Sequence, residues 1–301
     1  MQLQNDIKIN EYSVIPHKIT EKKLKEKKLL LTLSLFQDEM EMAITDASDN
    51  SVYTSCSYIS NQAKFTQNEQ IFFLNDFIHR YHLHQYDFQK IYIILSTPHF
   101  TLCPSEFYIS EKKELLLNYV HPIRTEELAF ADSFESVKIL YTIDKNIHQN
   151  LLQVFPSAHV GHSATAMMNM FFYHPLLVHS KIWIHIHPNY IEVMAKDNRQ
   201  LLMYNTFDIQ TSVDILYYIL FCIQQLNYSY KETDVFLSGN ISAQHTILRL
   251  LSKYVHSVQI VHHHPKLHIL PVESLLISHH HFITLNYHLC VSFQANTKAE
   301  K

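Results

Sequence analysis

Apolar and polar residues alternate with a period of two in the middle of the chain and then change to a helical spacing. Residues 182–187 alternate Ile with Trp or His, which predicts a strand with two different faces. Pro188 and Asn189 are typical turn residues, and Thr211 or Ser212 is expected to cap the helix that follows. The predicted order is three strands, a helix, a strand and a helix: 182–187, 190–195, 200–207, 213–226, 234–237 and 241–254.

The first half of the chain repeats this order without obvious residue identity to the second half. It is predicted as three strands, a helix and a strand: 29–35, 38–45, 51–59, 67–82 and 90–95. The other predicted strands are 100–103, 127–131, 137–143, 158–162, 258–262 and 281–293, and the other helices are 111–119, 144–155, 163–173 and 271–277. Ser110 and Ser242 are expected to cap the helices that begin next to them.

Composition excludes several classes of protein. A hydrophobic share of 47% in 301 residues is enough for one large or two ordinary cores, and the formal charge of −4 argues against a general nucleic-acid binder. Only two residues are glycine, Gly161 and Gly239, where about 20 are expected from average usage. Loops that cradle phosphate need glycine, so a well-formed phosphate loop is not expected.

The ends of the chain and its cysteines point to a cytoplasmic protein. Residues 1–10 are polar and lack the apolar core of a signal peptide, and the longest apolar helix, 213–226, is too short to span a bilayer. The four cysteines share no metal-ligand spacing and are expected to be reduced, buried thiols: Cys56, Cys103, Cys222 and Cys290.

Four stretches, in their order and spacing, resemble an uncharacterised bacterial family of unknown function that has the actin-like ATPase fold. They are 100–106 (FTLCPSE), 137–141 (VKILY), 184–192 (IHIHPNYIE) and 235–240 (VFLSGN). The resemblance covers about residues 28–293. It implies an α/β fold (α+β by some schemes) of two similar actin-like, ribonuclease H-like domains with a cleft between them. The expected division is a polar lead-in at 1–27, domains at 28–178 and 179–293, and a polar tail at 294–301.

Active members of the actin-like superfamily clasp the nucleotide phosphates with a glycine-containing hairpin in each half, and an Asp at each hairpin helps to hold Mg²⁺. Here the corresponding hairpins are 34–38, without glycine, and 185–189, without glycine or Asp. Bulky Phe36 and Pro188 stand where backbone would meet phosphate. Hydrolysis needs preorganised donors and a metal at the phosphates, so ATPase chemistry is not expected.

The resemblance leaves one candidate cofactor site, a vestigial nucleotide site. Gly239 and Asn240 lie in a turn like the one that holds adenosine in the superfamily, and His187 and Asn189 lie at the second hairpin. No catalytic residue, resident cofactor or metal ligand is assigned.

Three other motifs have more than one interpretation. The runs 262–264 and 279–281, with His185 and His187 on one strand face, can be Zn²⁺ or Ni²⁺ ligands, a pH-sensing surface, or simply polar loop and strand-end residues. Ser238 can be a nucleophile at a strand–helix turn, or a turn residue bonded to backbone. The pair Glu39 and Glu41 can do acid–base chemistry, although a solvated strand face is the expected interpretation.

The helix at 213–226 is apolar almost all round, so it is either buried between sheet and helix or exposes a stripe to a partner. The resulting hypothesis is a non-catalytic cytoplasmic binding or scaffold protein that contacts an unknown protein or itself, as pilus-assembly and division-associated actin-like proteins hold partners. Neither nucleic acid nor a membrane span is expected. The alternative is a divergent nucleotide-binding phosphotransferase or ATPase. It predicts an open polar cleft flanked by His187, Asn189 and Gly239 and faced by Asp38, whereas the first hypothesis predicts a cleft filled by side chains.

Overall fold

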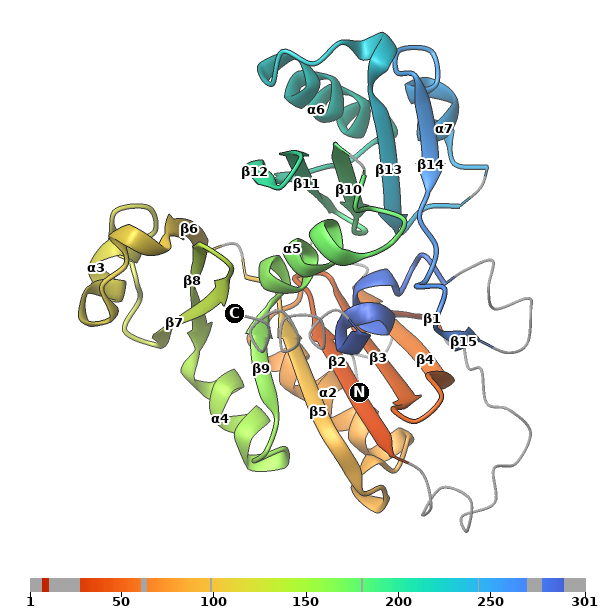
Figure 1. Ribbon diagram of the computed structural model, residues 1–301. Coiled ribbons are helices and arrows are strands. Elements are labelled where there is room, and N and C mark those ends of the chain that lie inside the picture. Colours follow the sequence, from red (N-terminus) through yellow and green to blue (C-terminus); the bar gives the residue numbers. More distant parts are fainter. Residues whose placement is uncertain are drawn as a thin grey trace.

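The computed structural model describes residues 7–10, 28–60, 64–97, 99–179, 181–242, 244–269 and 278–289, and it contains three sheets (Figure 1). The first sheet has the strand order β1-β4-β3-β2-β5-β9, with β15 beside β4. Its strands are β1 (Ile7–Asn10), β2 (Leu29–Leu35), β3 (Glu39–Asp46), β4 (Ser51–Ser60), β5 (Phe88–Leu95), β9 (His159–His162) and β15 (His268–Ile269).

Strand β2 is at the centre of this sheet because its run of Leu, Thr and Ser is buried on both faces. It pairs antiparallel with β3, where Leu31 is opposite Ile44, and parallel with β5, where Leu31 is opposite Ile91. Helix α2 (Gln67–Arg80) begins at Thr66, whose side chain and that of Glu69 form a reciprocal capping box. The buried apolar side of α2 joins the same core as β2.

The second sheet repeats the plan of the first and has the order β12-β11-β10-β13-β14. Its strands are β10 (Ile182–Ile186), β11 (Tyr190–Asp197), β12 (Gln200–Asp208), β13 (Asp234–Gly239) and β14 (Ser257–Ile260). Helices α6 (Ser212–Gln225) and α7 (Thr246–Leu251) pack their buried residues onto the apolar core of this sheet. Thr211, one of the two predicted cap residues, caps α6 and forms a capping box with Asp214.

A small third sheet stands to one side of the molecule, with the order β6-β8-β7 (Figure 1). Its strands are β6 (Phe100–Pro104), β8 (Val137–Asp144) and β7 (Glu127–Phe134). Helix α3 (Lys113–Asn118) belongs to this subdomain, and helix α4 (Lys145–Val154) follows β8 with Asp144 as its N-cap. The core of the subdomain is a separate small cluster that includes Leu117 and Leu140.

Helix α5 (Ser163–Tyr173) lies between the first and second sheets (Figure 1). Every residue from 163 to 172 is buried, and Phe171 packs against Trp183 of the second sheet. Lys196 of β11 is buried as well, and its ammonium group donates hydrogen bonds to the backbone carbonyls of Phe171 and Leu177. These contacts join the two sheets through a shared interior.

The order of the elements agrees with the sequence prediction, but four local predictions are wrong. The region predicted as a strand at 281–293 is helical over 282–289, and the helix predicted at 241–254 is only α7, capped by His245 instead of Ser242. Ser110 begins a 3-10 turn and makes no capping bond. The N-terminal lead-in contains β1, paired with β4. The helix predicted at 271–277 lies outside the described residues.

The expected solvated face of Glu39 and Glu41 is also wrong, because both side chains are buried. These side chains are buried because the C-terminal part of the chain packs against β3 and β4. Thr284 donates a hydrogen bond to Glu41, and Leu285 and Leu289 cover the neighbouring residues of β3 and β4. The chain after β14 therefore returns to the first sheet, whereas the sequence predicts that all of 179–293 belongs to the second domain.

Candidate functional site

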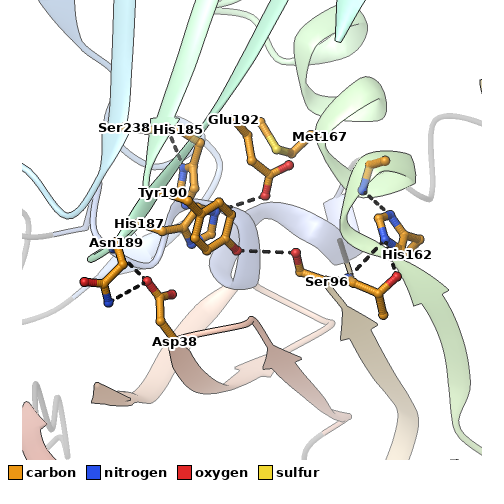
Figure 2. Close-up of polar contacts among 12 residues, drawn as sticks. Asp38, Ser96, His162, Met167, His185, His187, Asn189, Tyr190, Glu192 and Ser238 are labelled. Carbon is orange, nitrogen blue, oxygen red and sulfur yellow. Dashed lines mark hydrogen bonds and ion pairs between the residues drawn. The ribbon is translucent and has the colours of Figure 1, made fainter. Parts of the chain in front are cut away.

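The two hairpins that correspond to the phosphate hairpins lie face to face where the first and second sheets meet (Figure 2). The first hairpin joins β2 to β3 and closes with a 2.8 Å hydrogen bond from Phe36 N to Glu39 O. The second joins β10 to β11 and closes with a 2.9 Å bond from His187 N to Tyr190 O. Both turns are tight without glycine, and side chains therefore enter the space between them.

Phe36 fills this space. Its side chain is fully buried, and its ring centroid lies 4.8 Å from that of His187 in an edge-on arrangement and 6.4 Å from that of His185. Aromatic rings at these separations are in packing contact. Pro188 at the tip of the second hairpin is half-buried. The first hairpin thus packs directly on the second.

Asp38 connects the hairpins by hydrogen bonds. Its Oδ2 accepts from the backbone N–H of Asn189 at 2.7 Å and from the Asn189 side-chain amide at 3.2 Å (Figure 2). Asp38 is completely buried, and burial raises its pKa to about 7, against the lowering effect of the Asn189 bonds. Near neutral pH the carboxyl group is thus only partly ionised.

Behind the second hairpin, His187 belongs to a buried polar chain. Its Nε2 shares a 3.0 Å hydrogen bond with Glu192, which in turn accepts a bond from the Tyr204 hydroxyl. The Tyr190 ring stacks on His187 with centroids 4.0 Å apart, and the Tyr190 hydroxyl lies 3.3 Å from Ser96 Oγ of the first domain. These contacts extend the junction between the halves beyond Phe36 and Asp38.

Burial shifts the pKa values of the ionisable groups at this junction, including that of His162, the N-cap residue of α5. It lowers the pKa of His187 to about 3 and the pKa of His162 to about 4, and it raises the pKa of Glu192. Burial therefore keeps the His187 imidazole neutral near pH 7 and disfavours the charged form of Glu192, whose carboxyl group lies 3.0 Å from it. The arrangement therefore holds the fold together and presents no exposed acid or base.

Ser238 is fixed by two side chains. Its Oγ accepts from Trp183 Nε1 at 2.9 Å and lies 2.8 Å from His185 Nδ1. Ser238 and His185 are both buried, so the hydrogen bond between hydroxyl and imidazole is out of reach of a substrate. The expectation of a turn residue bonded to backbone is corrected to a side-chain bridge between β10 and β13.

Gly239 and Asn240 lie beside the second hairpin, at the end of β13. Gly239 is opposite Ile186 and has φ +90°, and an added Cβ would lie 2.1 Å from the Ile186 carbonyl oxygen. The Gly239 N–H donates to the carbonyl of His279 at 2.8 Å, and the Asn240 N–H donates to the Ile186 carbonyl at 2.6 Å. The backbone donors of this turn are thus engaged by the chain itself.

The four residues of the expected vestigial nucleotide site lie near one another, on the ends of β10 and β13 and the hairpin after β10. Their nucleotide role stays a prediction. A phosphate would need accessible backbone N–H groups, but the backbone N–H groups of all four residues donate to acceptors within the chain.

The histidine runs form contacts with each other and with the backbone. The rings of His262 and His279 are 5.2 Å apart, and His174 lies 5.1 Å from His264. Across the described part of the chain, no three His, Cys, Asp or Glu side chains converge as metal ligands. Three cysteines are buried as expected (Cys56, Cys103 and Cys222), and Cys290 lies outside the described residues.

Sequence reasoning missed several of the buried polar residues around the two hairpins. Glu192 stands opposite His185 in the strand register and was visible inside one of the four resembling stretches, but its burial was not deduced. Tyr204 and Ser96 lie far from the hairpins in sequence, and nothing in their local pattern marks them. The burial of Glu41 was missed because the sequence predicts a strand at 281–293, where a helical segment covers Glu41.

No helix within the described ranges combines the length and the apolar character that a bilayer crossing would need. The longest apolar helix candidate, α6, has 14 residues.

Comparison with solved structures gives the same fold. A Bacteroides thetaiotaomicron VPI-5482 protein with actin-like ATPase fold and unknown function is 22% identical, with a TM-score of 0.66 over 81% of this chain and 94% of its own. A chain in the PilM–PilN type IV pilus biogenesis complex is 10% identical, with a TM-score of 0.54 over 86% and 97%. The comparison with curated proteins gives no match.

The sequence itself matches one family model, described as a protein of unknown function (DUF3822), over residues 17–258. This match covers most of the chain and includes both hairpins and the turn after β13. The fold is therefore that of the actin-like ATPases, and the chain belongs to the DUF3822 family.

Proposed function

We propose that this chain is a non-catalytic binding protein on an actin-like fold, in which the nucleotide cleft is closed by the chain's own side chains. One observation carries the proposal: Phe36 is fully buried against His187 while Asp38 bonds to the backbone N–H of Asn189. The two hairpins that would clasp phosphates bind each other instead.

The chemistry of phosphoryl transfer supports the same conclusion. Such catalysis depends on backbone donors and cations aimed at the phosphate oxygens. Here the backbone donors of Asn189, Gly239 and Asn240 are used by protein acceptors. A nucleotide would have to break these bonds and expel the Phe36 ring before it could bind. The alternative of a phosphotransferase requires an open polar cleft, and the contact between the hairpins argues against it.

A role in protein contacts is supported by exposed apolar side chains outside the cleft. Helix α6 exposes Val213, Tyr217 and Phe221, and the small subdomain exposes Phe107 and Tyr119. Large exposed apolar groups are typical of surfaces that bind other proteins. The actin-like fold is compatible with such a role, because it also occurs in the PilM–PilN complex.

Thermal unfolding with and without ligand tests the proposal. The full chain is heated alone and with about 5 mM ATP or ADP plus Mg²⁺. A ligand of the folded state at 100 times its Kd adds about 2.7 kcal/mol, which is about 4 °C for a two-state chain of this length. We expect a change below about 1 °C and no phosphate release. A shift of several degrees, or release of phosphate that depends on the chain, would overturn the proposal.

A further inference from the structure

Helix α6 has an unusual outer face. Its nine residues from 215 to 223 (ILYYILFCI) include no charged or amide side chain, and the face opposite the sheet exposes Val213, Tyr217 and Phe221 by 64%, 60% and 40%. The buried side of the helix, with Ile215 and Ile219, already packs on the sheet. A helix that is apolar all round is normally covered on both sides.

The exposed residues form one continuous stripe. They are spaced four residues apart, which places them one above the other on the helix surface. The rings of Tyr217 and Phe221 are parallel within 16° and 6.1 Å apart, and Tyr217 also contacts Tyr218. We name Val213, Tyr217 and Phe221 the α6 stripe.

We propose that the α6 stripe is a self-association surface, on which α6 of a second copy of this chain packs antiparallel about a two-fold axis at Tyr217. The stripe is symmetric in spacing about Tyr217, with Val213 four residues before it and Phe221 four residues after. In the antiparallel arrangement each small Val213 meets the large Phe221 of the second copy. Such reciprocal pairing is what a two-fold interface requires.

Charge favours a second copy over other occupants. Identical surfaces bring identical charges together, so a two-fold interface is favoured where charge is absent. The single charged residue of α6 is Asp214, whose carboxylate accepts bonds from the backbone N–H groups of Gln210 and Thr211 at the helix start. Membrane-surface helices carry Lys or Arg on their polar face, and α6 has neither. The antiparallel arrangement also opposes the two helix dipoles.

The contact is small, so the dimer is expected to be weak. The stripe extends over nine residues, a rise of about 12 Å along the helix, so it buries less than the ~800 Å² per partner of a standard interface. We therefore expect a dissociation constant of about 1–100 µM. This inference rests on the proposed function in protein contacts. Its evidence is the geometry of α6, which is independent of the contact between the hairpins.

Sedimentation equilibrium of the full chain at about 1–200 µM tests the proposal. We expect a reversible monomer–dimer equilibrium, and Tyr217→Glu should raise its Kd at least ~10-fold because two carboxylates would meet at the axis. Tyr119→Glu, at an exposed tyrosine of the small subdomain, is the matched control and should leave the Kd unchanged. Unfolding curves verify that each variant is folded, which is expected because both positions are exposed.

A swap experiment tests the antiparallel register. Val213→Phe alone sets Phe against Phe, and Phe221→Val alone sets Val against Val, so each should weaken the dimer about 3–10-fold. The double variant restores the pairing of Val with Phe and should return to within about twofold of the original Kd. A chain that is monomeric throughout, a dimer insensitive to Tyr217→Glu, or a double variant no tighter than both single variants would overturn the proposal. Each of these results would leave the nucleotide test unaffected.

Discussion

Phe36 is the side chain whose removal should reveal most about the closed cleft. The ring is completely buried between the hairpins and packs edge-on against the His187 ring, with the two ring centroids 4.8 Å apart. Phe36→Ala would lose the transfer free energy of the ring and leave a cavity, which in protein cores costs about 3–5 kcal/mol. With an unfolding entropy of about 2.1 cal/mol/K per residue, 301 residues give about 0.6 kcal/mol per degree. The expected decrease in Tm is therefore about 5–8 °C.

The assay is thermal unfolding followed by circular dichroism, with urea unfolding as a second measure. Phe107→Ala is the matched control, because Phe107 is 66% exposed and its truncation should change the free energy of unfolding by less than about 0.5 kcal/mol. A decrease below about 1 °C for Phe36→Ala would refute the reasoning. It would mean that Phe36 does not fill the space between the hairpins in solution.

Two more predictions concern the same junction. Burial raises the pKa of folded Asp38 to about 7, above its unfolded value near 4, so ionisation opposes folding and the free energy of unfolding falls as pH rises between these values. From pH 5 to pH 8, the free energy of unfolding of Asp38→Asn should therefore rise by about 2–3 kcal/mol relative to that of the original chain, measured by urea unfolding. Parallel plots of unfolding free energy against pH for the two chains would contradict this prediction. Gly239→Ala should lower the free energy of unfolding by more than about 2 kcal/mol, because φ is +90° and the Cβ would lie 2.1 Å from the Ile186 carbonyl oxygen. Gly161→Ala, where the nearest contact of the Cβ is 3.2 Å, should lower it less. Equal losses of stability in the two variants, measured by urea unfolding, would contradict this prediction.

Local patterns were sufficient for most of the fold. The apolar run of β2, the alternating residues of β10 and the cap residue before α6 can be recognised from neighbouring positions, and these elements agree with their predictions. The C-terminal residues 282–289 (FITLNYHL) contain β-branched and aromatic side chains, which favour a strand, yet they are helical. In the fold they cover the β3 face that includes Glu41, so tertiary packing overrides local propensity.

The contact between the hairpins was predictable in part. The bulky Phe36 indicated from sequence that a side chain would stand between the hairpins, and it does so, whereas the inability to clasp phosphate stays a prediction. The bond between Asp38 and Asn189 was not predictable, because it joins residues 151 positions apart whose approach depends on how the two domains pack. The stripe on α6 was left open for a similar reason, since an apolar pattern does not say which of its sides the sheet will cover.

Hydrogen exchange at the Asn189 amide tests the closed cleft most directly. This N–H lies in a tight hairpin, where an open cleft would leave it to solvent, but it donates to buried Asp38 at 2.7 Å. We predict exchange protection close to that of the core amides of β10, and no change on addition of about 5 mM ATP and Mg²⁺. Exchange at the rate of an exposed loop, or protection that appears only when nucleotide is added, would contradict the account.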